Sequence, residues 1–246
     1  MSALDFHADE AAFVLHRLNG IDARLVAWDW PFARNEATRI AAQWAAMVAD
    51  KPRLFNGPVL LQREMRIEDG VARCAYFPTD YASFIAFRDF GPQDTGVRNG
   101  FAMAALRSRD GAFLLGEMGP HTANAGKVYF AAGTPDPSDV TPEGMVDLPG
   151  SVLRELEEET GLRAGEVDVG DDWGVMVGAT RAAFMRPVTI DLPADEARAL
   201  ICSRLAMLED DELSDIVIVR GEADLDPVRM PAFMRAYMRA MFGAGR

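Results

Sequence analysis

The segment from Arg154 to Leu162, which reads RELEEETGL, constrains this 246-residue chain more than any other. Its spacing predicts a helix, on which Glu155, Glu158 and Glu159 stand at positions i, i+3 and i+4. Side chains at these intervals lie on one helix face, so the three carboxylates converge and repel one another. A chain that keeps such a cluster must either solvate it or place a positive charge beside it.

The apolar residues of the segment support the helix. Leu153 and Leu156 lie away from the acidic face and predict contacts with a core. Gly161 followed by Leu162 is typical of a helix that ends in a left-handed residue with a hydrophobic contact behind it. We therefore expect a helix over about residues 149–160.

Two interpretations of the acidic face compete. A run of glutamates alone is typical of a solvated helix face. The Arg, Gly and aliphatic residues at fixed positions around this run favour a binding site instead. Carboxylate oxygens are the preferred ligands of hard divalent cations, so such a cation is the natural partner of the cluster.

The residues from Arg154 to Leu162 resemble the second half of the Nudix box, Arg-Glu-aliphatic-x-Glu-Glu-x-Gly-aliphatic, at every position. The resemblance implies a hydrolase in which Glu155, Glu158 and Glu159 bind Mg²⁺ or Mn²⁺. It also implies that Arg154 orients the first glutamate and that a metal-activated water attacks a phosphorus atom of a diphosphate.

The first half of the box departs from the family pattern. The glutamate expected eight positions before the arginine is Val146, and Asp147 follows one residue later. By strict counting the leading glycine falls on Val140, whereas Gly133 is the plausible counterpart and a candidate metal ligand through its backbone carbonyl. This alignment requires an insertion within residues 135–145, whose Pro and Asp content predicts a loop.

A further metal ligand is expected from a later acidic loop, because family members often add one there. The acidic residues before the predicted strand 216–219 are Glu209, Asp210, Asp211, Glu212 and Asp215, and we choose Glu212. The alternative is an ordinary acidic loop. A carboxylate that is not fully used as a ligand could act as general base, and the sequence does not identify which one.

Composition narrows the possible partners. A formal net charge of −13 argues against a nucleic-acid duplex or an anionic membrane as the main partner, since both require a basic face. A small phosphorylated ligand remains compatible, because a bound cation inverts the local charge. The first ten residues lack the pattern of a secretion signal, so we expect a cytoplasmic protein. Cys74 and Cys202 are expected to be buried free thiols.

Alternating strand and helix patterns predict an α/β fold, a Nudix-type α/β/α sandwich with a mixed sheet, preceded by a small α+β subdomain. We place the subdomain at residues 1–94 and the hydrolase domain at 95–246, with the boundary at Asp94-Thr95-Gly96. A helix is expected over 35–48 and a hairpin over 58–77. The later strands are expected at 100–106, 112–118, 127–132, 173–177, 182–190 and 216–219, and the later helices at 194–207 and 231–242.

The N-terminal part carries the clue to the substrate. The run from Leu54 to Gly57, with Thr79-Asp80-Tyr81 and the run from Phe87 to Phe90, is similar to the extension of a Nudix group that hydrolyses UDP-glucose and UDP-galactose. The resemblance implies that a nucleotide sugar is cleaved to a nucleoside monophosphate and a sugar phosphate. Tyr81 could stack on a base, with core packing as the alternative.

Arg98 and Lys127 could contact phosphate, with a solvated surface position as the alternative for each. A second hypothesis for the whole chain is a non-catalytic Nudix-fold module that binds nucleotides or regulates. The methionine-rich stretch over 229–239 predicts an apolar helix face that docks on its own core or on a second copy, so a homodimer is possible.

Overall fold

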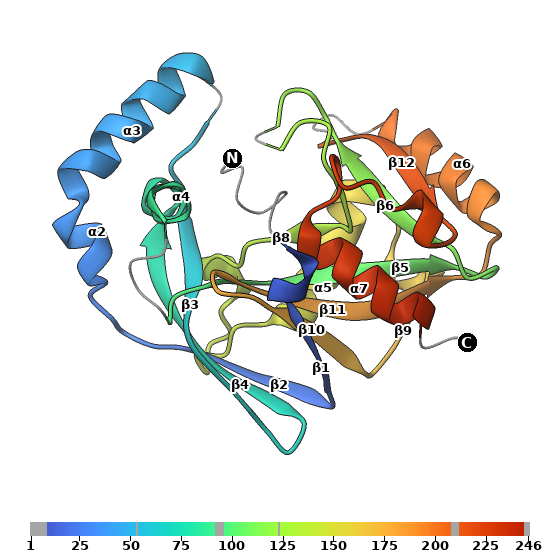
Figure 1. Cartoon of the computed structure of the whole chain (residues 1–246), viewed down its shortest axis with the longest axis horizontal. Helices are drawn as coiled ribbons and strands as arrows, with labels where there is room; N and C mark the ends of the chain where they lie inside the picture. Colours follow the sequence, from blue (N-terminus) through green and yellow to red (C-terminus); the bar gives the residue numbers. More distant parts are fainter. Residues whose placement is uncertain (1–8, 53, 92–95, 123, 208–211, 244–246) are drawn as a thin grey trace.

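The computed structural model describes residues 9–52, 54–91, 96–122, 124–207 and 212–243. Within these residues two sheets form (Figure 1). The larger is a nine-stranded mixed sheet with the strand order β1-β10-β11-β5-β6-β12, and the smaller has the order β2-β4-β3. The predicted mixed sheet and the small N-terminal α+β unit are both confirmed.

The centre of the large sheet is β5 (Asn99–Ser108), which pairs in parallel with β11 (Arg181–Ile190). On its other side β5 pairs with the antiparallel β6 (Phe113–Met118). The remaining long strands are β1 (Val14–Leu18), β10 (Trp173–Val177) and β12 (Leu213–Val219), and β9 (Asp168–Val169) pairs with β11. All the strands predicted after residue 100 are found, apart from 127–132.

Alternation along β5 divides the core into two layers. Ala102, Ala104 and Leu106 face one side, where they pack with α5 (Leu148–Thr160) and α6 (Ala194–Leu205). Phe101 and Met103 face the other side, which α7 (Ala232–Gly243) covers. Side chains of successive strand residues point to opposite faces, so this central strand is buried on both sides. The predicted C-terminal helix therefore docks on the chain's own core, as Figure 1 shows.

The N-terminal unit contains β2 (Gly20–Leu25), β3 (Pro58–Glu68) and β4 (Val71–Asp80). The helices α2 (Pro31–Asn35), α3 (Ala37–Asp50) and α4 (Tyr81–Phe90) pack beside this sheet through a largely aromatic cluster that includes Trp30, Phe77 and Phe87. The predicted hairpin is confirmed, and its strands are longer than expected. Helix α4 starts at Tyr81, where the Asp80 side chain accepts a hydrogen bond from the Ser83 backbone N–H.

The first strand links the two parts of the chain. Although β1 lies early in the sequence, it pairs with β10 in the large sheet. A bridge between Gln62 and Arg98 joins β3 to the residue before β5. The predicted boundary lies partly outside the described residues, and the division into 1–94 and 95–246 stays a prediction.

The predicted strand over 127–132 is wrong as a single element. The structure has two short strands there, β7 (Val128–Tyr129) paired with β6 and β8 (Ala132–Gly133) paired with β5. Between them the backbone carbonyl of Ala131 accepts a hydrogen bond from the backbone N–H of Ala104 at 3.1 Å. The chain thus changes partner within a few residues, and this carries Gly133 to the acidic face of α5.

The two free cysteines differ in burial. Cys74 is buried, and burial raises the pKa of its thiol to about 12. Cys202 is half-buried, and its Sγ atom lies 3.4 Å from Asp215 Oδ1. The expectation of a buried thiol therefore holds for Cys74, whereas for Cys202 it is wrong. Among the described residues no helix is long and apolar enough to cross a membrane.

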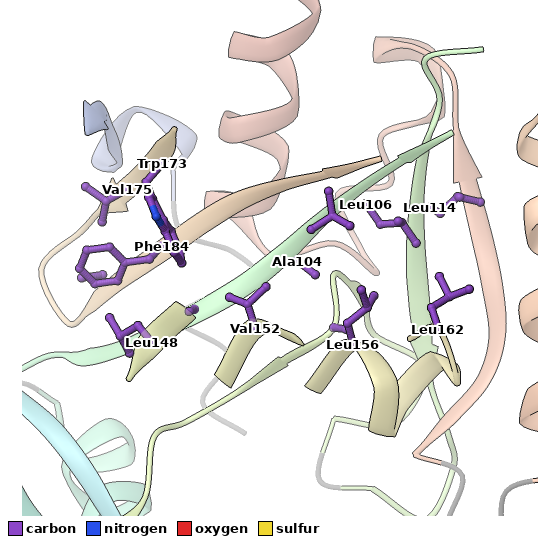
Figure 2. Packing of buried hydrophobic residues seen from close by; sticks show 14 of the residues in the cluster. Ala104, Leu106, Leu114, Leu148, Val152, Leu156, Leu162, Trp173, Val175 and Phe184 are labelled. Atoms are coloured by element: carbon purple, nitrogen blue, oxygen red, sulfur yellow. The ribbon is translucent and has the colours of Figure 1, made fainter. Parts of the chain in front are cut away.

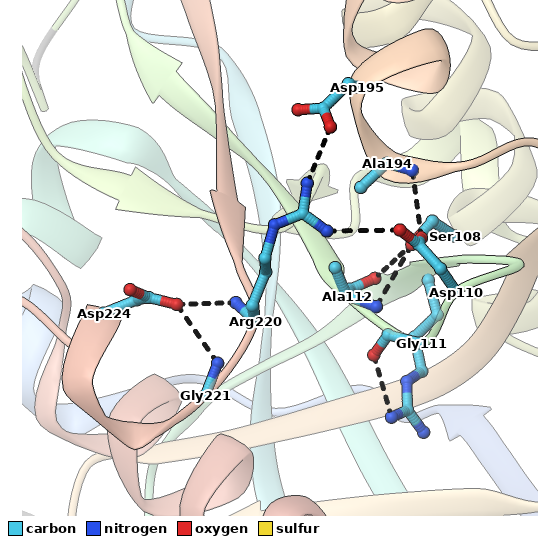
Figure 3. Close-up of polar contacts among 10 residues, drawn as sticks. Ser108, Asp110, Gly111, Ala112, Ala194, Asp195, Arg220, Gly221 and Asp224 are labelled. Atoms are coloured by element: carbon cyan, nitrogen blue, oxygen red, sulfur yellow. Dashed lines mark hydrogen bonds and ion pairs between the residues drawn. The ribbon is translucent and has the colours of Figure 1, made fainter.

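A polar network connects the β5–β6 turn to the start of α6 and to the residue after β12 (Figure 3). Asp110 accepts a hydrogen bond from the backbone N–H of Ala194, the first residue of α6, at 2.9 Å. Arg220, just after β12, donates to Asp110 at 3.1 Å and to Asp195 at 2.9 Å. The carboxylate of Asp110 thus caps α6 from a different element. Hydrogen bonds from Ser108 and Ala194 also lower the pKa of Asp110.

Truncating Leu156 should test whether the buried face of α5 is the anchor of the acidic segment. This side chain is 1% exposed and packs between the helix and the sheet (Figure 2). Leu156→Ala should lower the free energy of unfolding by about 2–5 kcal/mol, because it leaves a cavity in a closed core. Urea denaturation measures the change. Val228→Ala, at a side chain 68% exposed, is the matched control and should stay within about 0.5 kcal/mol of the wild type.

Candidate active site

Helix α5 carries its three carboxylates from its buried face outward, with Glu159 buried beside the core residues and Glu158 the most exposed. Asp147 caps the start by accepting a hydrogen bond from the Gly150 N–H at 2.9 Å, and Gly161 ends the helix in the left-handed region with φ of 69°. The predicted helix end is confirmed. Along this face the side chains of Glu155 and Glu158 are 16% and 61% exposed, and Glu159 is buried. Three adjacent carboxylates thus occupy three different environments.

Arg154 is the electrostatic centre of this face. Its Nη2 lies 3.0 Å from Glu155 Oε1, and its Nε lies 3.8 Å from Glu158 Oε1. Its Nη1 lies 2.5 Å from Asp139 Oδ1. These acidic partners raise the pKa of Arg154, with the hydrogen bond that Arg154 donates to Asp139 as the largest cause. The guanidinium therefore holds Glu155 in place, which is the role that the resemblance implies.

Asp139 is a site residue that the sequence did not reveal. Its side chain is 1% exposed and lies in the predicted loop, within the short 3-10 helix η2 (Pro137–Asp139). One oxygen accepts from Arg154 and the other from the backbone N–H of Asp136 at 3.0 Å. A signal was present, because Asp136-Pro137-Ser138-Asp139 has the form of a capping box, in which the third residue returns a hydrogen bond to the cap.

Gly133 lies against the first glutamate. A Cβ atom added to Gly133 would stand 2.3 Å from Glu155 Oε1 and 2.5 Å from its carboxyl carbon. Only glycine admits a carboxylate this close to the backbone. The structure thus brings the predicted Gly133 and Glu155 together, and it extends the site to Thr134, whose Oγ1 lies 3.2 Å from Asn99 Nδ2.

Glu159 is the buried member of the cluster. Its Oε1 accepts a hydrogen bond from the backbone N–H of Ala132 at 3.2 Å. Its Oε2 is buried and has no hydrogen-bond partner among the described residues. Burial raises the pKa of this carboxyl well above its usual range, and the charges of Glu155 and Glu212 raise it further. An unpartnered buried oxygen is costly, and a cation beside it would remove that cost.

Glu159 opens into a cavity of about 550 Å³ that also receives Glu212. A volume in this range suits a small-molecule ligand. Tyr81 lines the cavity from the N-terminal unit, together with Lys51, Leu54 and Phe55. The loop residue His121 lies there too. The predicted residues Glu159, Glu212 and Tyr81 are therefore brought together, while Glu209, Asp210 and Asp211 lie outside the described residues.

Arg98 and Lys127 lie apart from this cavity. The Arg98 side chain donates to the backbone carbonyls of Gly178 at 3.0 Å and of Gly96 at 3.3 Å. Lys127 Nζ donates to the carbonyl of Val228 at 3.0 Å. Both cations support loops in this structure, and a phosphate-binding role for them stays a prediction.

The metal site is not preassembled in the described part of the chain, where no group of three or more His, Cys, Asp or Glu side chains is arranged to hold an ion. Arg154 draws Glu155 and Glu158 toward itself, while Glu159 turns inward to β8. The residues nevertheless fit a divalent cation, because Glu159 has an unpartnered oxygen and Gly133 leaves room beside Glu155. The ligand set Glu155, Glu158, Glu159, Glu212 and Gly133 stays a prediction.

The chain is structurally similar to Nudix hydrolases over about 60% of its length. One is a Nudix hydrolase from M. smegmatis, RenU, at 18% identity, with 60% of this chain and 86% of that chain covered and a TM-score of 0.39. An Ap4A hydrolase from C. elegans shares 16% identity over 59% and 99% of the two chains, with a TM-score of 0.42. A MutT protein from Methanosarcina mazei Go1 shares 19% identity over 60% and 94%, with a TM-score of 0.36. Neither a protein-family model nor a curated protein sequence matches this chain.

Glu159→Gln should stabilise the protein in the absence of divalent cations. Because the pKa of Glu159 is raised in the folded state, the wild type loses stability as the pH rises through that pKa, whereas the glutamine variant does not. The gain in Tm should be absent below about pH 4 and should grow as the pH increases. Thermal melts in chelator across this range measure it. Glu157→Gln, at a side chain 56% exposed, should show no such growth. A variant that melts with the wild type at every pH would contradict the assignment.

Proposed function

We propose that this chain is a metal-dependent hydrolase that cleaves a diphosphate linkage. The observation that carries the proposal is the buried Glu159 carboxylate, whose Oε2 has no hydrogen-bond partner among the described residues and which opens into the cavity with Glu212. A buried carboxylate in this state, in a cavity with a second carboxylate, marks a candidate functional site. Its place on the helix of the RELEEETGL motif agrees with the chemistry of the resemblance.

A series of contacts between residues of this chain would position the first metal ligand. Asp139 is held by the Asp136 N–H and fixes Arg154, and Arg154 in turn fixes Glu155 beside Gly133. Glu155, Glu158 and Glu159 would hold Mg²⁺ or Mn²⁺, with Glu212 and the Gly133 carbonyl as further candidate ligands. Such a cation offsets phosphate charge and lowers the pKa of a bound water. A carboxylate of the cluster would accept the proton released by that water.

The substrate we propose is a nucleoside diphosphate linked to another group, with nucleotide sugars such as UDP-glucose as the first candidates. Hydrolysis would give a nucleoside monophosphate and a phosphorylated product. Support for the nucleotide sugar comes from the resemblance of the N-terminal segments, three of whose residues, Leu54, Phe55 and Tyr81, line the cavity that contains Glu159. A cytoplasmic location and a homodimer stay predictions.

Glu158→Gln separates the hydrolase from a non-catalytic binding module. Glu158 is the most exposed of the three motif carboxylates, so its replacement should leave Tm unchanged while it removes a metal ligand. We expect the wild type to release product from one class among UDP-sugars, ADP-ribose, dinucleoside polyphosphates and nucleoside triphosphates when Mg²⁺ or Mn²⁺ is present. Turnover by the variant should fall below detection.

Glu157→Gln is the matched control, since Glu157 lies next to Glu158 in the chain and pairs with Arg163 at 3.6 Å instead of Arg154. This variant should keep wild-type turnover. If the wild type is inactive across the panel, and divalent cations also fail to raise its Tm, the hydrolase proposal is wrong and the binding module takes its place.

Asp139→Asn should lower activity although Asp139 stands apart from the three glutamates. Loss of the charge would release Arg154 and let Glu155 turn away from its position. The expected loss is about 10–100-fold in kcat/KM, the usual effect of removing an outer partner of a metal ligand. The apparent affinity for Mg²⁺, measured from activity against cation concentration, should fall with it. An unchanged cation dependence would indicate that Asp139 only stabilises the loop.

A further inference from the structure

A second cavity adjoins the one that contains Glu159. We call it the ring compartment, and its walls come from α4, β5, β8, β11 and α7. The two cavities share the wall residues Tyr81, Asn124, Tyr129 and Ala132. Gly133 and Thr134 also line the ring compartment, so it begins where the glutamate cluster ends. A substrate whose diphosphate lies at the cluster could therefore extend one of its ends into this space.

The ring compartment differs from its neighbour in charge. Arg88 of α4 and Arg181 of β11 line it, and among the described residues no aspartate or glutamate does. The adjoining cavity contains Glu159 and Glu212. In a chain with a formal net charge of −13, a cavity whose described wall residues include two arginines and no carboxylate differs from the acidic surroundings. The compartment is therefore suited to a group that accepts hydrogen bonds or carries negative charge.

Both guanidinium groups are held in position. Arg88 Nε donates to Asp89 Oδ1 at 2.9 Å, and the Arg88 side chain is 15% exposed. Arg181 lies over two aromatic rings, with its guanidinium carbon 5.6 Å from the centroid of Phe101 and 5.1 Å from that of Phe233. A cation over an aromatic face is attracted by the ring. Fixed donors of this kind discriminate between ligands better than mobile ones do.

The size and walls of the compartment suit one ring. Its volume is about 160 Å³, and a cavity of ~150 Å³ is known to accept a single benzene ring. Tyr81, Phe84, Phe101 and Tyr129 supply aromatic wall surface. Asn99 and Asn124 add side-chain amides. A six-membered ring with polar atoms at its edge matches this combination of aromatic and polar walls.

We propose that the ring compartment binds a single six-membered ring whose edge carries hydrogen-bond acceptors, and that Arg88 and Arg181 select it. Two sources have this chemistry, a pyrimidine base with carbonyl oxygens and a sugar ring with a carboxylate. Arginine donates hydrogen bonds and accepts none, so an amino group at the same place leaves a donor facing a donor. The link between the compartment and the reaction rests on the proposed hydrolase, whereas ring selection itself does not.

Equilibrium binding tests the selection with two pairs of probes. UMP and CMP differ at one edge of the base, where uracil has a carbonyl beside a ring N–H and cytosine has an amino group beside an unprotonated ring nitrogen. Glucuronic acid 1-phosphate and glucose 1-phosphate differ in a carboxylate against a hydroxymethyl group. Calorimetry with Mg²⁺ present should show about tenfold or stronger preference for the acceptor member of one pair. Preference in the first pair identifies a base, and preference in the second a sugar acid.

Arg88→Met should reduce that preference to less than about threefold, and Arg88→Lys, which keeps the charge and loses the planar fork, should give an intermediate value. Arg109→Met is the matched control and should keep the full preference, since Arg109 lies on the β5–β6 turn and pairs with Asp191, the residue after β11. Melting curves verify that each variant folds. Should Arg88→Met fail to fold, the Lys variant and the wild-type comparison still decide the result.

Equal binding within both pairs by the wild type, or a preference that survives in Arg88→Met, would overturn the proposal. These outcomes are distinct from failure of the hydrolase. Selective binding without metal-dependent turnover retains the ring compartment and rejects the hydrolase. Turnover of a diphosphate substrate with equal binding in both pairs retains the hydrolase and rejects ring selection by the ring compartment.

Discussion

The site depends on how α5 is buried. Its apolar residues, among them Leu148, Val152 and Leu156, pack against the large sheet and fix the helix. The same packing forces Glu159 into the interior, where a single backbone N–H from Ala132 meets its carboxylate. Desolvation of a carboxylate is costly unless its oxygens are partnered. The hydrophobic core thus places a charge where the chain alone does not satisfy it, and such a position favours a bound cation.

A second constraint is the short path from β7 to β8. Two-residue strands give little stability by themselves, and here they are held because one pairs with β6 and the next with β5. This change of partner brings the backbone of Gly133 against Glu155 from one side, while Asp139 and Arg154 hold that glutamate from the other. The position of Glu155 is therefore fixed by elements that are separate in sequence.

Local pattern explains which parts of this structure could be predicted. Apolar runs in β5 and β11, helical spacing in α5 and the left-handed Gly161 are properties of neighbouring residues, and the sequence predicts each of them. Asp139 lies fifteen positions before its partner Arg154, inside a loop without periodicity, so only the capping box hinted at its role. The partner change at residues 130–131 depends on strands that are distant in the chain, and no local pattern encodes it.

The N-terminal unit contributes wall residues from α4 to both cavities. Glutamates from α5 and the loop before β12 make one cavity acidic, whereas Arg88 from α4 makes the adjoining one basic, and Tyr81 borders both. Tyr81 and Arg88 belong to the same helix, which the Asp80 cap and the aromatic cluster hold beside the small sheet. Because the catalytic candidates and the selecting arginine come from different units, changes in α4 can alter ligand choice while the carboxylate cluster on α5 stays intact. In the proposed enzyme, the difference in charged wall residues between the two cavities would separate chemistry from specificity.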